Sequence, residues 1–176
     1  MSINQSFIME LQHEAANTHK ILERIPTEKN DWKPHDKSMK LGNLVTHISD
    51  LPTWITMIMT TDELDLASIN YKPVIAITTA QITETFDKNV KGALAALENG
   101  SDEDFGKLWT LRRGDHVIVA MPKAAVLRSM VLSHQYHHRG QLTVYLRLLD
   151  VPVPGLYGPS ADDLIAMAAA SEATAN

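Results

Sequence analysis

Residues 131–142 read VLSHQYHHRGQL and place three histidines within five positions of an otherwise apolar stretch. Residues four apart on a helix lie on one face, one above the other. His134 and His138 have this spacing. They interrupt a stripe of apolar residues that consists of Leu127, Val131, Leu142, Tyr145 and Leu149. We therefore predict a long helix here, with both imidazoles pointing into the core and His137 on its flank.

The apolar pattern on either side of this stretch predicts further amphipathic helices. We place the four long helices at about residues 2–25, from 41 to about 60, at 79–97 and at 122–149. Pro52 lies inside the second helix and should kink or divide it. Residues 101–121 alternate β-branched and polar side chains around an Arg-Gly-Asp turn, which indicates a hairpin or another extended excursion.

Four long amphipathic segments are typical of an all-α four-helix bundle. The expected fold has a short extended or hairpin excursion before the last long helix and a short C-terminal helix at about residues 161–170. A chain of 176 residues is the size of one domain, so we expect residues 1–176 to form a single domain. Two long connections, at residues 26–40 and 101–121, leave the order of up and down helices open.

The composition excludes several kinds of protein. With 16 basic and 21 acidic residues, the net charge is −5, which disfavours nucleic-acid binding because phosphate contacts need a clustered basic face. The chain has no cysteine, so it offers no disulfide, no thiolate ligand and no protein thiol as nucleophile. No signal pattern and no apolar run of ~18 residues is present, and we expect a cytoplasmic protein without a membrane partner.

A third histidine lies on the apolar face of a different predicted helix. His47 is flanked there by Leu44, Ile48 and Leu51. Helical bundles build metal sites from side chains on facing helices, and a divalent cation uses neutral imidazole nitrogens. His47, His134 and His138 therefore predict a metal site. Core histidines that are hydrogen-bonded to carbonyls or water are the alternative for each of them.

The spacing disfavours two known kinds of metal site. A zincin peptidase would carry H-E-x-x-H, with the glutamate as general base, whereas Gln135 follows His134 and cannot take a proton. A di-iron bundle would need Glu-x-x-His pairs, and no glutamate lies three positions before any of these histidines. Three protein ligands would leave a coordination position for water or substrate, as catalytic zinc sites do.

Four other residues are candidates for a supporting role. Asp50 could orient an imidazole, or it could simply be a surface carboxylate. His137 flanks the pair His134 and His138. Tyr145 shares the inward stripe and could donate a proton or simply be a core tyrosine. Arg139 could bind a ligand carboxylate, or it could be a solvated arginine, and the same holds for Arg112 and Arg113.

Two stretches resemble the DinB-like superfamily, bacterial four-helix bundle proteins named for damage-inducible genes and distinct from the DNA polymerase that shares the name. SHQYHHRGQLTVYLRLLDVPVPGLYGPSADD, at residues 133–163, is similar to the family's C-terminal signature. DWKPHDKSMKLGNLVTHISDLPTW, at residues 31–54, resembles the region around its first ligand histidine. The family pattern, carried over, falls on His47, His134 and His138.

This resemblance implies a divalent metal, often zinc or nickel, with water completing the coordination, and frequent homodimers. Some relatives transfer low-molecular-weight thiols such as bacillithiol, mycothiol or glutathione, others are similar to maleylpyruvate isomerase, and many have no known reaction. A divalent metal deprotonates a bound thiol, and the thiolate is the nucleophile. A chain without cysteine could activate an external thiol cosubstrate in this way.

Three functional hypotheses follow. The first is a metal-dependent enzyme of thiol-transferase or hydrolase type that acts on a small molecule. The second is a non-catalytic metal-binding protein of the stress response. The third is a structural dimer in which the metal only fixes the packing of the helices. The sequence shows no evident general base beside the three histidines. It therefore discriminates only weakly among these three hypotheses.

Overall fold

A computed structural model of the protein describes residues 2–70 and 72–174, and these residues are mostly helical. Its elements, in chain order, are α1 (Ile3–Leu22), the 3-10 turn η1 (Thr27–Lys29), α2 (Leu41–Thr60), β1 (Glu63–Asp65), α3 (Thr79–Glu98), α4 (Asp102–Gly106), β2 (Leu108–Arg113), β3 (His116–Pro122), α5 (Lys123–Val126), the π-helix η2 (Leu127–Leu132), α6 (Ser133–Leu148) and α7 (Ala161–Thr174).

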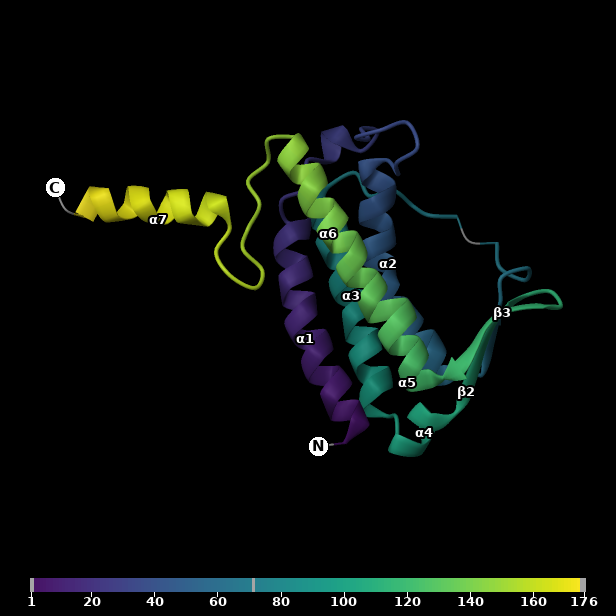
Figure 1. Cartoon of the computed structure of the whole chain (residues 1–176). Helices are drawn as coiled ribbons and strands as arrows, with labels where there is room; N and C mark the ends of the chain where they lie inside the picture. The colour runs from purple at the N-terminus through teal and green to yellow at the C-terminus, as the bar shows by residue number, and fades with distance from the viewer. Residues whose placement is uncertain (1, 71, 175–176) are drawn as a thin grey trace.

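The long helices α1, α2, α3 and α6 lie side by side (Figure 1). Both α1 and α2 pack against α3 and against α6, so every long helix buries one face against two others. The start of α3 is capped, because the Thr78 side chain accepts a hydrogen bond from the Gln81 N–H. Ser2 precedes α1 but makes no such side-chain bond to the helix backbone.

The chain is not all-α, because three strands form a small sheet in the order β1-β2-β3. The expected hairpin is present as β2 and β3, which pair antiparallel around Gly114, whose φ is +56°. Strand β1 follows α2 directly and pairs parallel with β2, with Glu63 opposite Thr110. The sequence did not indicate β1, since three residues carry too little pattern to mark a strand.

The last long helix differs from a regular α-helix in its first half. Residues 122–149 were expected to form one α-helix, but η2 adopts a π-helical path between α5 and α6. At its end the Ser133 N–H bonds to the Arg128 carbonyl, five residues back. Pro52, by contrast, does not divide α2, which is continuous from Leu41 to Thr60.

Two hydrophobic clusters fill the interior, one beside the sheet and one at the opposite ends of the long helices. The first includes Phe105 and Trp109, and the second includes Leu22 and Phe86. The α6 histidines follow Leu132 of the first cluster and precede Leu142 of the second, so they lie between the two clusters along the helix. Gln135 and Arg139, on the same stretch of α6, are also buried.

The segment between α6 and α7 is held by carboxylates from the first turn of α7. Asp162 accepts hydrogen bonds from the Val153 N–H and the Arg147 guanidinium, and Asp163 accepts from the N–H groups of Gly155 and Ser160. A Cβ on Gly155 would lie 2.1 Å from a backbone oxygen, so only glycine fits this turn. Beyond it α7 projects away from the other helices (Figure 1), and none of its residues is buried.

Candidate metal centre

The structure brings together three histidines from two helices. His47 projects from α2, and His134 and His138 project from successive turns of α6. One ring nitrogen from each lies within 4.8 Å of the other two, and none of the three side chains is exposed. The ring centroids are 4.5–4.9 Å apart. The sequence predicted this convergence from helical spacing and from the apolar surroundings of His47.

The positions of these nitrogens fit a divalent ion. Two imidazole nitrogens on a tetrahedral zinc, at about 2.0–2.1 Å from the ion, lie roughly 3.3 Å from each other. The Nε2 atoms of His47 and His134 are 3.3 Å apart. Those of His134 and His138 are 2.7 Å apart and would need to separate by roughly half an ångström to reach the same geometry. The three nitrogens could therefore hold a metal with only small movements of the rings.

The surroundings of His47 and His138 favour the neutral imidazole, which is the form that binds metal. Burial lowers the pKa of His47 to about 4, and the nearby rings of His138 and His134 act in the same direction. Burial also lowers the pKa of His138, although a hydrogen bond with Gln141 opposes this effect. Protons therefore compete weakly with a cation at these two rings at neutral pH.

Gln141 contacts one of the three histidines, and its sequence pattern alone did not mark it for this role. Its Oε1 lies 2.7 Å from Nδ1 of His138. Because the amide oxygen can only accept, Nδ1 carries the proton and Nε2 is left with a free lone pair toward His134. The only sequence signal for this role is that Gln141 follows His138 by three residues on the same helix.

Two of the four proposed supporting residues lie on α2 and α6 close in sequence to the histidines. His137 is exposed, and its ring centroid is 5.0 Å from that of His138. Asp50 lies about one turn after His47 on α2, where it lines a recess between this helix and the connector at residues 72–76. The structure thus places both residues on the helices that carry the site, but only His137 has its ring beside one of the three histidines.

The other two have their partners elsewhere. The Tyr145 hydroxyl donates to the Met39 carbonyl at 3.1 Å, and its ring packs edge-on against Trp32 at 5.5 Å, so it is a core tyrosine that fixes the connector before α2. Arg139 is neither solvated nor directed at the histidines. It is buried and forms an ion pair with Glu14 of α1 at 2.5 Å. Its position next to His138 turns it about 100° to another face of α6.

A comparison with known families places the chain. The model of the DinB family matches residues 1–169, almost the entire sequence. The chain belongs to the DinB family. The two stretches that resembled this family at the sequence level are those that build the three-histidine cluster and the segment before α7.

Solved DinB-like proteins share the fold. One from Bacillus cereus ATCC 10987 is 22% identical, with 87% of this chain and 97% of that chain aligned and a TM-score of 0.67. YjoA from Bacillus subtilis is 17% identical, over 86% of this chain and 97% of that one, with a TM-score of 0.68. At these identities the likeness concerns the fold alone.

A closer sequence match covers a short segment. The uncharacterized protein YrdA of Bacillus subtilis (strain 168) is 44% identical over 43 residues, which is 24% of this chain and 25% of that protein. This match therefore spans about a quarter of each chain. In the part of this DinB-family chain that the structure describes, no helix has both the length and the apolar character needed to cross a bilayer.

Proposed function

We propose that this DinB-family protein binds a divalent metal ion, zinc or nickel, through His47, His134 and His138 and uses it as an enzyme acting on a small molecule. The single observation that carries the proposal is the convergence of three ring nitrogens within 4.8 Å from two separate helices. Three protein ligands leave room for water or substrate, which is the feature that separates catalytic zinc sites from closed structural ones.

The residues of the chain have distinct roles in this proposal. The three histidines hold the ion, and Gln141 fixes the tautomer and orientation of His138 through its Oε1. A bound divalent ion would supply Lewis acidity, which lowers the pKa of a water or thiol. Since the chain has no cysteine, a thiol would have to come from a low-molecular-weight cosubstrate. This reasoning supports a thiol transferase, with a hydrolase as the other form of the same chemistry.

Metal binding is tested on the purified full-length chain by elemental analysis and by calorimetric titration with zinc and with nickel. We expect one ion per chain in the parent and loss of binding in His134→Ala. The matched control is His116→Ala, because His116 is exposed and lies on β3, which carries none of the three histidines. Equal metal content in the parent and in His134→Ala would reject the proposed metal site.

Catalysis is tested separately by following the conjugation of a low-molecular-weight thiol to an electrophile, and the hydrolysis of activated esters, with and without a chelator. We expect a rate that falls on chelation and returns when metal is restored. A protein that binds metal but shows no chelator-sensitive rate would be a non-catalytic metal-binding protein, for example of the stress response. The hydrogen-bond partner of His138 favours this second function, because an amide such as Gln141 cannot serve as a general base.

The proposal includes a homodimer, and the exposed apolar side chains of α7 support it. Leu164, Ile165 and Met167 are 55%, 69% and 63% exposed. An isolated helix of 14 residues is marginal in water, so burial of these side chains against a second copy would stabilise it. The hydrogen bonds of Asp162 and Asp163 fix the first turn of α7 against the segment that precedes it.

A further inference from the structure

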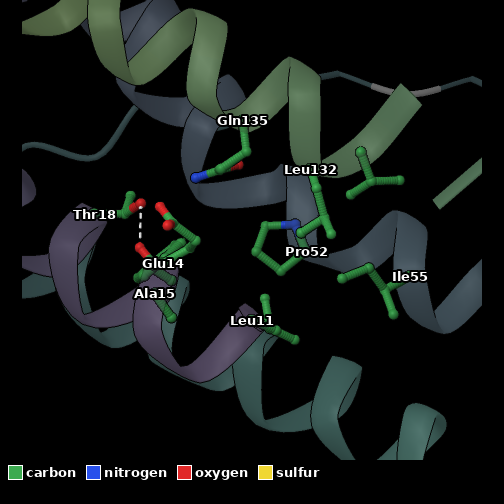
Figure 2. Close-up of a pocket in the computed structure, with 10 residues that line it drawn as sticks. Leu11, Glu14, Ala15, Thr18, Pro52, Ile55, Leu132 and Gln135 are labelled. Carbon is green, nitrogen blue, oxygen red and sulfur yellow. Dashed lines mark hydrogen bonds between the residues drawn. The ribbon is translucent and has the colours of Figure 1, made fainter. Parts of the chain in front are cut away.

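The side of α6 that faces away from the interior carries an open apolar recess. Figure 2 shows the interior side instead, where Gln135 lines a small cavity together with Leu11 of α1 and Pro52 of α2. The recess is lined by four residues of α6 and one of the segment that follows it: Thr143, Val144, Arg147, Leu148 and Val153. Val144 and Leu148 are 56% and 57% exposed. Exposed apolar side chains gathered in a recess mark a surface on which a helix can dock.

A glycine continues this outer face of α6 one turn before the recess. Gly140 lies four residues before Val144, in the middle of the helix, and is exposed. A Cβ added to it would meet nothing within 4 Å among the described residues, so no neighbour in the same chain requires a glycine there. Apart from proline, glycine is the residue that disfavours a helix interior most. Close approach by a helix of another molecule would account for it, because a missing side chain lets two helices come nearer.

Helix α7 begins at the edge of this recess but does not cover it. Asp162, in its first turn, accepts hydrogen bonds from Arg147 and from the Val153 N–H, and both of these residues line the recess. From there α7 projects away from the other helices (Figure 1), and none of its described residues is buried. Leu164 and Met167 are three positions apart, so they share one face of this exposed helix. The chain therefore carries an apolar helix and an apolar recess, both without a partner in the part that the structure describes.

We propose that α7 of one protomer docks in the α6 recess of a second copy, and that the second copy returns the same contact. The inference rests on the proposed homodimer and specifies the surface through which it forms. Because one chain carries both the helix and the recess, the exchange closes into a two-fold dimer with two identical contacts. The 14 residues of α7 span about 21 Å, enough to cover the recess and to reach Gly140. The alanines at 168–170 would let α7 cross α6 closely at this glycine.

Charge favours this contact over the packing of two α7 helices against each other. Residues 161–174 contain Asp162, Asp163 and Glu172 and neither a lysine nor an arginine. Two such helices side by side would bring only carboxylates together, and like charges across an interface oppose association. Among the described residues that line the recess, Arg147 is the only charged one, and its side chain is 51% exposed. The acidic helix thus meets a cation and no carboxylate on α6 of the second copy.

The absence of cysteine from the sequence allows a direct test by disulfide cross-linking of full-length chains. One preparation carries Val144→Cys, and a second, distinguished by an affinity tag, carries Leu164→Cys, Met167→Cys or Ser171→Cys, three sites along one face of α7. The two are mixed, oxidised with diamide and analysed by non-reducing electrophoresis and mass spectrometry. We expect disulfides between tagged and untagged chains. Gln12→Cys in place of Val144→Cys is the matched control for random collision, because Gln12 is exposed on α1.

Gly140→Leu gives a second, independent readout. Within one chain the new side chain enters open space and replaces a residue that disfavours helix, so the melting temperature of the monomer should not fall. In the docked dimer it would meet α7, and the dimer dissociation constant should rise at least about tenfold, measured by analytical ultracentrifugation with Gln12→Leu as control. An unchanged constant, or disulfides only between two α7 cysteines, would overturn this contact and leave the dimer standing. A parent that stays monomeric would reject the dimer and the contact together.

Discussion

A histidine inside a helical core needs a partner at each ring nitrogen, because an unpaired buried nitrogen costs roughly 1–3 kcal/mol. His138 illustrates how the chain meets this need, with Gln141 at Nδ1 and the shared point between the three rings at Nε2. A single metal ion can satisfy three converging nitrogens at once, because every nitrogen then donates its lone pair to the ion.

At the residue scale, Gln141→Ala should weaken metal binding without abolishing it. The substitution leaves all three ligands but frees the His138 ring to rotate and to change tautomer. Loss of such outer partners typically lowers metal affinity by about 10–100-fold. Calorimetric titration with zinc measures the effect, and Gln12→Ala, at an exposed glutamine of α1, is the control. An unchanged dissociation constant for zinc in Gln141→Ala would show that the hydrogen bond from His138 to Gln141 does not orient the imidazole for metal binding.

The low pKa of His47 predicts how the stability of the metal-free protein depends on pH. In the folded state the pKa is about 4, against an ordinary 6.5, so between these values the unfolded chain binds more protons. The free energy of unfolding should therefore fall as the pH decreases from 6.5 toward 4. Urea denaturation in the presence of a chelator measures this slope. His47→Gln should make it shallower, and an identical slope in the variant would contradict the assignment.

The three-histidine cluster could be predicted from the sequence because it depends on local geometry. The spacing of His134 and His138 and the apolar neighbours of His47 suffice to place three imidazoles on inward faces. The partner of Arg139 could not be predicted in this way. Glu14 lies 125 positions away, and nothing local to either residue indicates that they meet in the core.

At the scale of elements, α6 contacts two different helices through two different faces. One carries the histidines toward α2, and the other carries Arg139 to α1, where it also donates to the Glu14 carbonyl and to Thr18 Oγ1 at 3.0 and 3.1 Å. Helix α6 is therefore held on its α1 side by a buried ion pair and further hydrogen bonds. Such an arrangement is costly to break from one side, because the remaining charge stays buried.

Arg139→Ala should accordingly destabilise the protein by about 3–5 kcal/mol, as is usual when one partner of a buried ion pair is removed. Chemical denaturation measures the change. Arg147→Ala, which breaks the largely exposed pair with Asp162, is the matched control and should cost far less. Equal losses in the two variants would mean that burial of the Arg139 pair contributes nothing special.

The long helices were predictable from their apolar spacing, and their bounds agree closely for α2 and α3. The strand β1 and the π-helix η2 were not. β1 exists because Glu63 pairs with Thr110, 47 positions later, and a pattern read within a window cannot show such a contact. η2 keeps the composition of an ordinary amphipathic helix, so only its hydrogen bonds distinguish it.

At the scale of the whole molecule, α7 predicts self-association. Ile165→Asp places a charge on the most exposed of its large apolar residues, and burying an isoleucine contributes roughly 1.5–3 kcal/mol. We expect the dimer dissociation constant to rise by at least about tenfold. Light scattering after size-exclusion chromatography measures it. Met9→Asp, at a similarly exposed position on α1, is the control, and a parent that is monomeric at all concentrations would reject the dimer.

The two helices joined at the histidines are far apart in the chain, since His47 and His134 are separated by 87 positions. An ion between them would work as a removable cross-link, closing a long loop only while it is bound. Each tenfold rise in free metal above the dissociation constant would then add about 1.4 kcal/mol to the folded state. The lifetime of the protein in the cell would then depend on the metal supply. Molecules without metal would unfold more often and would be degraded by proteases sooner.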